Sequence, residues 1–425
     1  MKKTVLIAIL SLITIPSVNA QQLKGISGEN NWLKNWTNFK PATTEYNDAS
    51  NILTGIIDCN IILYKKNTYR LVGTVYVTKN AVLTIEPGTV IRGDKETCGT
   101  LVVTKGASII AEGTETDPIV FTSNNNISER KPGDWGGIII LGDAPINKMG
   151  GVSYLDFNLD SAISYYGGQD QDSNSGILKY VRIEFSGRKI NALKELNGIS
   201  LAGVGRKTKI DYIQVSYSND DSFECYGGLV NLNNLISYRA TDDDFDYTQG
   251  VQCNISNSLA IRHPFSSDIS GSRCFEIDSY DKPENTDFSK KLSKITANNI
   301  TLINMEESNQ GLVREAIYVK DKSYFSLNNS VVSGFKQCVL LENKIAVVPA
   351  NLAKINLQGI LINNCESNIQ SEIEANNTEI MNWYKNDSFS LEYSKVPNAS
   401  LFAESNTKKI PDFRLKANNV VVNGY

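Results

Sequence analysis

The residues of this chain best suited to chemistry are two acidic clusters that lie 22 positions apart. They occupy 219–224 and 241–246, so that Asp221 corresponds to Asp243, and a shorter copy follows at 274–278. Carboxylates placed above one another repel unless a cation, a basic ligand or water compensates their charge. Calcium takes about 6–8 oxygen ligands in flexible geometry, and two neighbouring clusters supply that number. The pattern therefore predicts a calcium site.

The predicted calcium ligands come from both clusters and from the shorter copy. They are Asp221, Glu224, Asp242, Asp243, Asp244, Asp246 and Glu276, with Asp220 and Asp278 beside them. Their spacing is not that of an EF-hand loop, because the glycine at the sixth position and the distal glutamate are absent. The alternative is a set of solvated acidic loops, in which some carboxylates accept hydrogen bonds from backbone amides at tight turns. The sequence leaves both interpretations open.

The interval of 22 residues also indicates the fold that positions these side chains. Short apolar strands recur after Asn, Tyr or Gly, at 180–183, 212–215, 234–237, 257–261, 299–302, 329–332, 359–362 and 419–422. Such strands, with a period of about 20–50 residues, are typical of β-solenoids, whereas a propeller blade needs four strands. We therefore predict an all-β fold, a right-handed parallel β-helix (a single-stranded solenoid). Phe223, Phe245 and Phe275 should form one inward-facing column.

The first part of the chain has the composition of a targeting segment. Residues 1–20 combine Lys2 and Lys3 with an apolar run and a small-residue end, which predicts a secretory signal peptide cleaved before Gln21. The apolar run is too short to span a bilayer, and no later stretch is long enough, so the sequence predicts no membrane span.

The rest of the chain divides into a lead-in and one solenoid. Residues 21–68 are expected to form an irregular N-terminal cap whose Trp32 and Trp36 cover the open end of the solenoid. An uncovered terminal coil would expose a strand edge and an apolar interior. Residues 69–425 are expected to form the β-helix, with an irregular insertion near 366–395 that includes a helical segment.

Charge and composition exclude several classes of function. The formal net charge is −4, which gives no electrostatic basis for nucleic-acid binding. The single histidine, His263, argues against histidine-based catalysis and multi-histidine metal sites.

The cysteines suggest interior packing rather than a disulfide framework. They are Cys59, Cys98, Cys225, Cys253, Cys274, Cys338 and Cys365. An odd count in an exported protein leaves at least one thiol unpaired, and free cysteine usually packs as a small buried hydrophobe. Cys59 and Cys98 form the pair to test as a bridge, because both lie near the expected N-terminal cap.

Three segments resemble known proteins. The segments 81–91 and 101–123 resemble the opening coils of many bacterial right-handed β-helix proteins. The segment 133–147, with 242–246 downstream, resembles a large set of uncharacterised exported Bacteroidota proteins, many of them associated with the outer membrane or with TonB-dependent transporters. The resemblance implies a β-helix and an exported location at the cell surface, at the outer membrane or in the periplasm. Many relatives carry a C-terminal sorting domain, whereas residues 417–425 are expected to form one more coil.

These observations predict a non-catalytic extracytoplasmic binding or accessory protein of a Gram-negative envelope. The expected partner is an outer-membrane protein, such as a TonB-dependent transporter, or a carbohydrate. No spacing assembles a recognisable acid–base set, since a catalytic base must lie within hydrogen-bond reach of its target with a suitable pKa. Tyrosines near the expected corners could stack on sugar rings or on a protein partner; they are Tyr165, Tyr166, Tyr217, Tyr226, Tyr238 and Tyr247.

Two alternatives remain open. The first is a carbohydrate-active enzyme, either a polysaccharide lyase or a glycoside hydrolase. In β-helix lyases, calcium neutralises a uronate carboxylate and an Arg or Lys removes the adjacent proton, and paired carboxylates also suit glycoside hydrolysis. Basic residues near the acidic clusters are Arg239, Arg262, Arg273, Arg314 and Lys320. The second alternative is a structural or adhesive surface solenoid.

Overall fold

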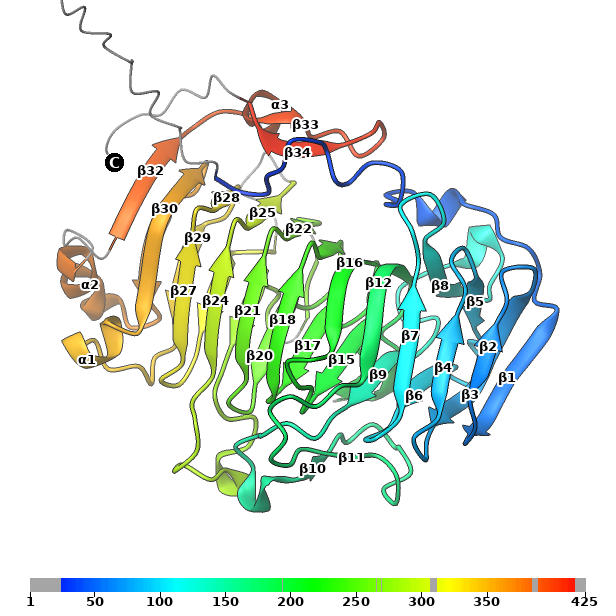
Figure 1. Ribbon diagram of the computed structural model, residues 1–425. Helices are drawn as coiled ribbons and strands as arrows, with labels where there is room; N and C mark the ends of the chain where they lie inside the picture. Colours follow the sequence, from blue (N-terminus) through cyan, green and yellow to red (C-terminus); the bar gives the residue numbers. More distant parts are fainter. Residues whose placement is uncertain are drawn as a thin grey trace, which may run out of the picture.

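Short parallel strands stack along one axis and form a parallel β-helix, which confirms the predicted fold (Figure 1). The computed structural model describes residues 24–192, 194–264, 266–268, 270–305, 312–383 and 389–416. The expected signal peptide and the expected coil at 419–422 lie outside these residues. Successive coils place their strands in three ladders, and most ladder neighbours in Figure 1 come from consecutive coils.

The first ladder carries the acidic clusters. Its strands are β6 (Thr100–Val103), β9 (Gly137–Leu141), β15 (Ile199–Ala202), β17 (Phe223–Tyr226), β20 (Phe245–Thr248), β23 (Phe275–Ile277), β26 (Glu315–Val319), β29 (Gln337–Leu341) and β31 (Ser367–Ser371). The second ladder contains β2 (Ile61–Leu63), β4 (Val82–Ile85), β7 (Ser108–Glu112), β18 (Leu229–Asn233), β21 (Gln252–Ser256), β24 (Lys294–Asn298) and β27 (Tyr324–Asn328). The third contains β5 (Val90–Gly93), β8 (Ile119–Ser123), β19 (Ile236–Tyr238), β22 (Leu259–Arg262), β25 (Thr301–Asn304) and β28 (Val331–Ser333).

Longer strands pass through a corner and take part in two ladders. They are β1 (Asn51–Ile57), β3 (Thr68–Val77), β12 (Gly176–Glu184), β16 (Lys209–Ser216), β30 (Ile355–Asn363) and β32 (Phe389–Ser394). Backbone conformation explains why Asn or Gly stands at the start of so many of the repeated strands. Positive φ angles at the corner between the second and third ladders occur at Tyr180, Tyr212, Asn234, Asn257, Asn299, Asn329 and Gly359. Asn and Gly tolerate this left-handed conformation better than other residues, so the sequence marks the corners directly.

The interior holds the predicted aromatic column. Phe223 pairs with Phe245, and Phe245 pairs with Phe275, in adjacent parallel strands. Their ring centroids are 5.4 and 5.0 Å apart along the column, and none of the three side chains is more than 1% exposed. Burying a phenylalanine stabilises a fold by about 1.5–3 kcal/mol, so the column holds the coils in register beneath the acidic residues.

The cysteines lie in the structure as free thiols. Cys225, Cys253, Cys274, Cys338 and Cys365 are buried, as the sequence predicted. The bridge considered between Cys59 and Cys98 is wrong, because both residues are free and Cys59 is exposed.

Residues 24–48, here called the N-terminal strap, run along the side of the solenoid. The amide of Gly25 donates to the carbonyl of Asn329 at 2.7 Å, and the amide of Asn38 donates to Gln214 Oε1 at 2.7 Å. Further along, the hydroxyl of Tyr46 donates to Glu184 at 3.0 Å. The strap therefore passes from the late coils back to the early ones, as the dark-blue segment in Figure 1 shows.

This path corrects the expectation that Trp32 and Trp36 cover the open end of the solenoid. Trp36 packs edge-on against Tyr180 and Tyr212 on the side, with ring centroids 5.7 and 5.9 Å apart. The physical reason is that the outer face of the third ladder is apolar. Exposing this face to water is as unfavourable as exposing the open end of the solenoid, and the strap covers it. Buried residues there are Ile236, Leu259, Ile261, Ile303, Val331 and Leu361, in contact with strap residues Ile26, Leu33, Trp36 and Phe39.

The two ends of the solenoid differ from the expected boundaries in detail. β1 and β2 already belong to the parallel sheet, although they precede residue 69. Near the other end, α2 (Asn377–Trp383) lies between β31 and β32, where the sequence indicated a helical segment. Both flanking strands still pair with the preceding coil, so the insertion interrupts the last coil without ending it.

Short hairpins, helical turns and 3₁₀ turns lie on the outside of the solenoid. The hairpins are β10 (Ser153–Tyr154) with β11 (Tyr165–Tyr166), β13 (Lys189–Asn191) with β14 (Lys194–Glu195), and β33 (Phe402–Glu404) with β34 (Asp412–Leu415). The α-helices α1 (Pro349–Leu352) and α3 (Asn398–Leu401) are single turns, and 3₁₀ turns lie at Pro41–Thr43, Ile127–Glu129, Met149–Gly151, Pro283–Asn285 and Glu374–Asn376. The segment that carries β10 and β11 packs on the outer face of the first ladder beside the acidic clusters.

Candidate functional site

The acidic residues lie where the third ladder turns into the first. Asp220 and Asp221 occupy this corner just before β17, and Asp242 occupies it just before β20. Side chains alternate between the two faces of a strand, so the residue after each inward phenylalanine points outward. Glu224 and Asp246 are such residues, and the strand register places them directly beside each other.

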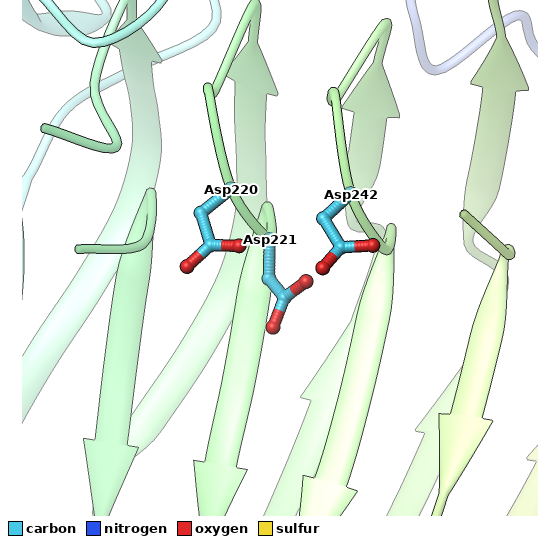
Figure 2. Close-up of side chains that lie close together, drawn as sticks. All are labelled: Asp220, Asp221 and Asp242. Atoms are coloured by element: carbon cyan, nitrogen blue, oxygen red, sulfur yellow. The ribbon is translucent and has the colours of Figure 1, made fainter. Parts of the chain in front are cut away.

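Five carboxylates converge at this place. Oxygens of Asp220, Asp221 and Asp242 lie within 4.8 Å of one another, as do oxygens of Asp221, Glu224 and Asp246 (Figure 2 shows the first group). Asp221 belongs to both groups and is 6% exposed, whereas the other four are half-buried and reach the surface. We call these five residues the acidic site. Oxygens bound to one calcium ion at about 2.3–2.6 Å lie up to about 5 Å apart, so each group has suitable dimensions.

Burial and mutual repulsion make the ionised state of the site unfavourable. Burial, followed by repulsion from Asp220 and Asp246, raises the pKa of Asp221 well above its ordinary value. Burial raises the pKa of Glu224 to about 8, although hydrogen bonds to Glu224 from Tyr226 and Asn197 act in the opposite direction. The pKa values of the remaining members are also raised, chiefly by burial and then by neighbouring carboxylates: Asp220, Asp242 (to about 7) and Asp246. A bound divalent cation would reverse this effect.

Two buried oxygens of the site have no hydrogen-bond partner among the residues that the structure describes. Oδ1 of Asp242 and Oδ1 of Asp246 are buried and accept no hydrogen bond from the described residues. A buried acceptor without a partner costs about 1–3 kcal/mol, and more when it is charged. Calcium coordination would satisfy both oxygens, so the donor set fits a hard cation bound through oxygen alone.

The other three predicted ligands have partners elsewhere. Asp243 Oδ1 accepts a hydrogen bond from the amide of Arg273 at 2.5 Å. Asp244 is fully buried and forms an ion pair with Arg262 at 3.3 Å. Glu276 forms ion pairs with Arg273 and Lys320 at 2.7 and 2.6 Å. The structure therefore brings together four of the seven predicted ligands and adds Asp220 to them.

The basic side chains next to the acidic site form ion pairs with carboxylates outside it. Besides its contacts to Glu276, Arg273 binds Glu315 at 2.8 Å, and Lys320 lies 3.7 Å from Asp278. Burial lowers the pKa of Lys320, but Glu276 and Asp278 outweigh this effect and raise it. At the other edge, Lys189 of the β13–β14 hairpin pairs with Glu195 at 2.5 Å. Among the described residues, the five carboxylates of the acidic site thus form no ion pair, while Glu276 and Asp278 next to it have basic partners.

Two further basic residues named from the sequence, Arg239 and Arg314, form no ion pair with the described residues of the site. The guanidinium of Arg239 stacks on Tyr217 and Tyr238, at 5.9 and 5.2 Å from the ring centroids. Arg314 is exposed, and its backbone carbonyl accepts hydrogen bonds from the amides of Lys336 and Gln337.

Sequence reasoning missed the amide that supports Glu224. Asn197 Nδ2 donates to Glu224 Oε2 at 2.5 Å, and the hydroxyl of Tyr226 donates to the same oxygen. Asn197 precedes β15 by two residues, as Asp221 precedes β17, and β15 pairs with β17. Aligning the strands one coil earlier would have placed Asn197 in the column of Asp221.

Comparison with known proteins identifies the fold family. The pectate-lyase-like β-helix domain family matches residues 55–401. The chain belongs to this family. Among the described residues, no helix of this pectate-lyase-like β-helix is long and apolar enough to cross a membrane. No curated protein matches the chain.

Two solved structures are similar to the pectate-lyase-like β-helix. They are the enzymatically active domain of bacteriophage CBA120 tailspike protein 2 and the full-length tailspike protein 2 of an Escherichia coli O157:H7 bacteriophage. Each has 11% sequence identity and a TM-score of 0.29, and the match covers 78% of this chain. The match covers 42% and 38% of the respective tailspike chains, so this chain spans less than half of their length.

Proposed function

We propose that this chain is a non-catalytic protein that binds acidic polysaccharide through a calcium ion held at the acidic site. The observation that carries the proposal is the distribution of charge on the first ladder. Glu276 and Asp278 form ion pairs with Arg273 and Lys320, whereas none of the five carboxylates of the acidic site forms an ion pair within the described part of the chain. A cation bound from solution would relieve the repulsion among these carboxylates at neutral pH.

The position of the site favours a ligand that shares the calcium. Four of its five carboxylates are half-buried, so an ion bound there remains accessible from outside. Calcium takes about 6–8 oxygens, and a glycan that carries uronate carboxylates supplies hard oxygen ligands of the same kind. The chain itself has a net charge of −4, so direct contact with a polyanion is unfavourable and a bridging cation overcomes the repulsion.

The basic residues argue for binding without cleavage. A lyase needs a base that can lose its proton near the calcium-bound sugar. Arg262 is fully buried, and the carboxylates paired with it and with Arg273 raise the pKa values of both, against the effect of burial. The pKa of Lys320 is raised in the same way, so its ammonium stays protonated at neutral pH. None of the three suits the role of base in this arrangement.

We further propose that the protein acts outside the cytoplasm of a Gram-negative cell, docked on an outer-membrane protein such as a TonB-dependent transporter. The support is the signal-peptide composition of residues 1–20 and the resemblance of 133–147 to exported proteins. Affinity purification from native envelope, followed by mass spectrometry, tests this part. Recovery of an outer-membrane transporter supports docking, and recovery of the protein alone contradicts it.

The test of the binding function uses polygalacturonate and a neutral glucan as probes, with calcium or with chelator. The proposal predicts retention of the protein by polygalacturonate in calcium only, with no unsaturated or shortened products. Asp221→Asn should abolish retention, whereas Glu96→Gln, a change at an exposed carboxylate outside the site, should not. Retention that is unaffected by chelator or by Asp221→Asn would contradict the proposal.

A glycoside hydrolase is the second candidate, and one observation favours it. The pKa of Glu224, about 8, would keep this carboxyl protonated at neutral pH, as a general acid requires. Glu224 lies beside two further carboxylates, Asp221 and Asp246. Shortened products from either probe, lost in Glu224→Gln and independent of calcium, would establish this candidate in place of the first.

A further inference from the structure

A recess lies away from the acidic site, between the N-terminal strap and the corner where the second ladder turns into the third. Its volume is about 530 Å³, within the range of about 300–1,000 Å³ that is usual for small-ligand sites. We call it the strap pocket. Its lining includes Asn30, Trp32, Lys34, Glu115, Tyr180 and Tyr212.

The apolar wall of the strap pocket is a fixed set of aromatic rings. Tyr180 and Tyr212 stack with centroids 4.5 Å apart and planes 22° apart. Trp32 meets Tyr212 edge-on at 6.0 Å and stacks on the fully buried Trp36. The three lining rings are half-buried, so part of their surface faces the pocket. Rigid aromatic rings present contact area at a low cost in conformational entropy.

The remaining wall is polar and carries charges of both signs. Lys34 and Glu115 are exposed, and the side-chain amide of Asn35 donates to Glu115 Oε1 at 2.7 Å. This hydrogen bond joins the strap to the solenoid coil that contains Glu115, and it holds the Glu115 carboxylate at the rim of the pocket. One cation and one anion leave little net charge, so the pocket has no preference for a strongly ionised ligand.

We propose that the strap pocket binds a neutral pyranose unit of an oligosaccharide, independently of calcium and of the acidic site. Sugar rings have an apolar face of C–H groups and an edge of hydroxyls. The C–H face would stack on Tyr212 or Trp32, while the hydroxyls would bond to Lys34, Glu115 and the strap amides. The observations fit this ligand because aromatic area and bidirectional hydrogen-bonding groups meet in one recess.

The strap and the solenoid both contribute residues to the strap pocket, so a bound sugar also joins the two. Ligand that binds only the folded state raises its stability by about 2.7 kcal/mol at a hundredfold excess over the Kd. Binding therefore should appear both as direct affinity and as a rise in melting temperature.

The experiment titrates the full mature chain, in chelator, with three probes: β-1,4-linked hexasaccharides of glucose, of xylose and of mannose. We expect at least one probe to bind by calorimetry and to raise the melting temperature. Tyr212→Ala and Lys34→Ala should each weaken binding at least tenfold. Tyr324→Ala is the matched control, because this exposed tyrosine lies on β27 away from the pocket.

Lys34→Ala keeps the test decisive if Tyr212→Ala unfolds the protein, since Lys34 is exposed. Absence of binding for all three probes overturns the proposal, as does binding that Lys34→Ala leaves unchanged. Chelator separates this result from the proposed function: sugar binding here persists without calcium, whereas retention by polygalacturonate does not.

Discussion

Neutralising one carboxylate of the acidic site should have opposite effects with and without calcium. Asp246→Asn keeps the shape of the side chain and removes its charge. Without calcium the change should stabilise the protein, because the half-buried Asp246 lies beside Glu224 and Asp221, and burial and repulsion raise its pKa. With calcium the same change removes a ligand, so the stabilisation by calcium should shrink.

The structure gives the size of the first effect. The carboxylate oxygens of each group lie within 4.8 Å of one another, and two full charges at that limit repel by about 3.5 kcal/mol at an effective dielectric constant of about 20. At pH 7 the cost of one carboxylate cannot exceed about 4 kcal/mol, because beyond that the folded protein binds a proton instead. We expect a gain of about 2–4 kcal/mol. For 425 residues, about 0.9 kcal/mol corresponds to one degree, so the melting temperature should rise by about 2–4 °C.

The assay is thermal unfolding of wild type and variant at pH 7, in chelator and in calcium at about a hundredfold excess over the Kd. Wild type should gain about 2.7 kcal/mol from calcium, and Asp246→Asn clearly less. Glu276→Gln provides the contrast: it removes one of the two ion-pair partners of both Arg273 and Lys320, and it should destabilise the protein in chelator. A destabilising Asp246→Asn in chelator, or an equal calcium response in both proteins, would refute the reasoning.

Three further predictions follow from the interior and from the pKa values. Phe245→Ala should lower the free energy of unfolding by about 3–5 kcal/mol in urea titration, because the ring is fully buried in the aromatic column; a loss below 1 kcal/mol, roughly, would contradict its position. In chelator the melting temperature should fall as the pH rises from about 5 to about 8, since the folded state retains protons on groups such as Glu224, whose pKa is about 8, that the unfolded state has released; a rise over this range would show that the site is not strained by charge. A thiol reagent should modify exposed Cys59 at once and the five buried cysteines only after unfolding, and rapid modification of Cys225 would contradict the described interior.

Much of the solenoid could be predicted because its signals are local and repeated. The 22-residue interval from Phe223 to Phe245 is one coil, and Asn at a positive φ marks the same corner in several coils. The path of the strap could not be predicted in this way. Trp36 contacts Tyr180 and Tyr212, more than 140 positions away, and nothing near it in the sequence shows which face of the solenoid is apolar.

The candidate site was predictable as a region but not in its membership. Periodicity places Glu224, Asp246 and Glu276 in one outward column, and the register agrees. Only the structure shows that Arg273 and Lys320 neutralise Glu276, because Arg273 follows a long corner loop and Lys320 comes from the next coil. Which carboxylates remain free for a cation depends on such long-range partners.

The most direct test of the calcium site is a crystal structure determined from crystals grown with calcium. We expect an ion bound by oxygens of the acidic site at about 2.3–2.6 Å, with Asp221 among its ligands and waters at the outward positions. Calcium replaced by an isomorphous anomalous scatterer should give a peak at the same place. Density without an ion at the acidic site, in a protein saturated with calcium, would contradict the account.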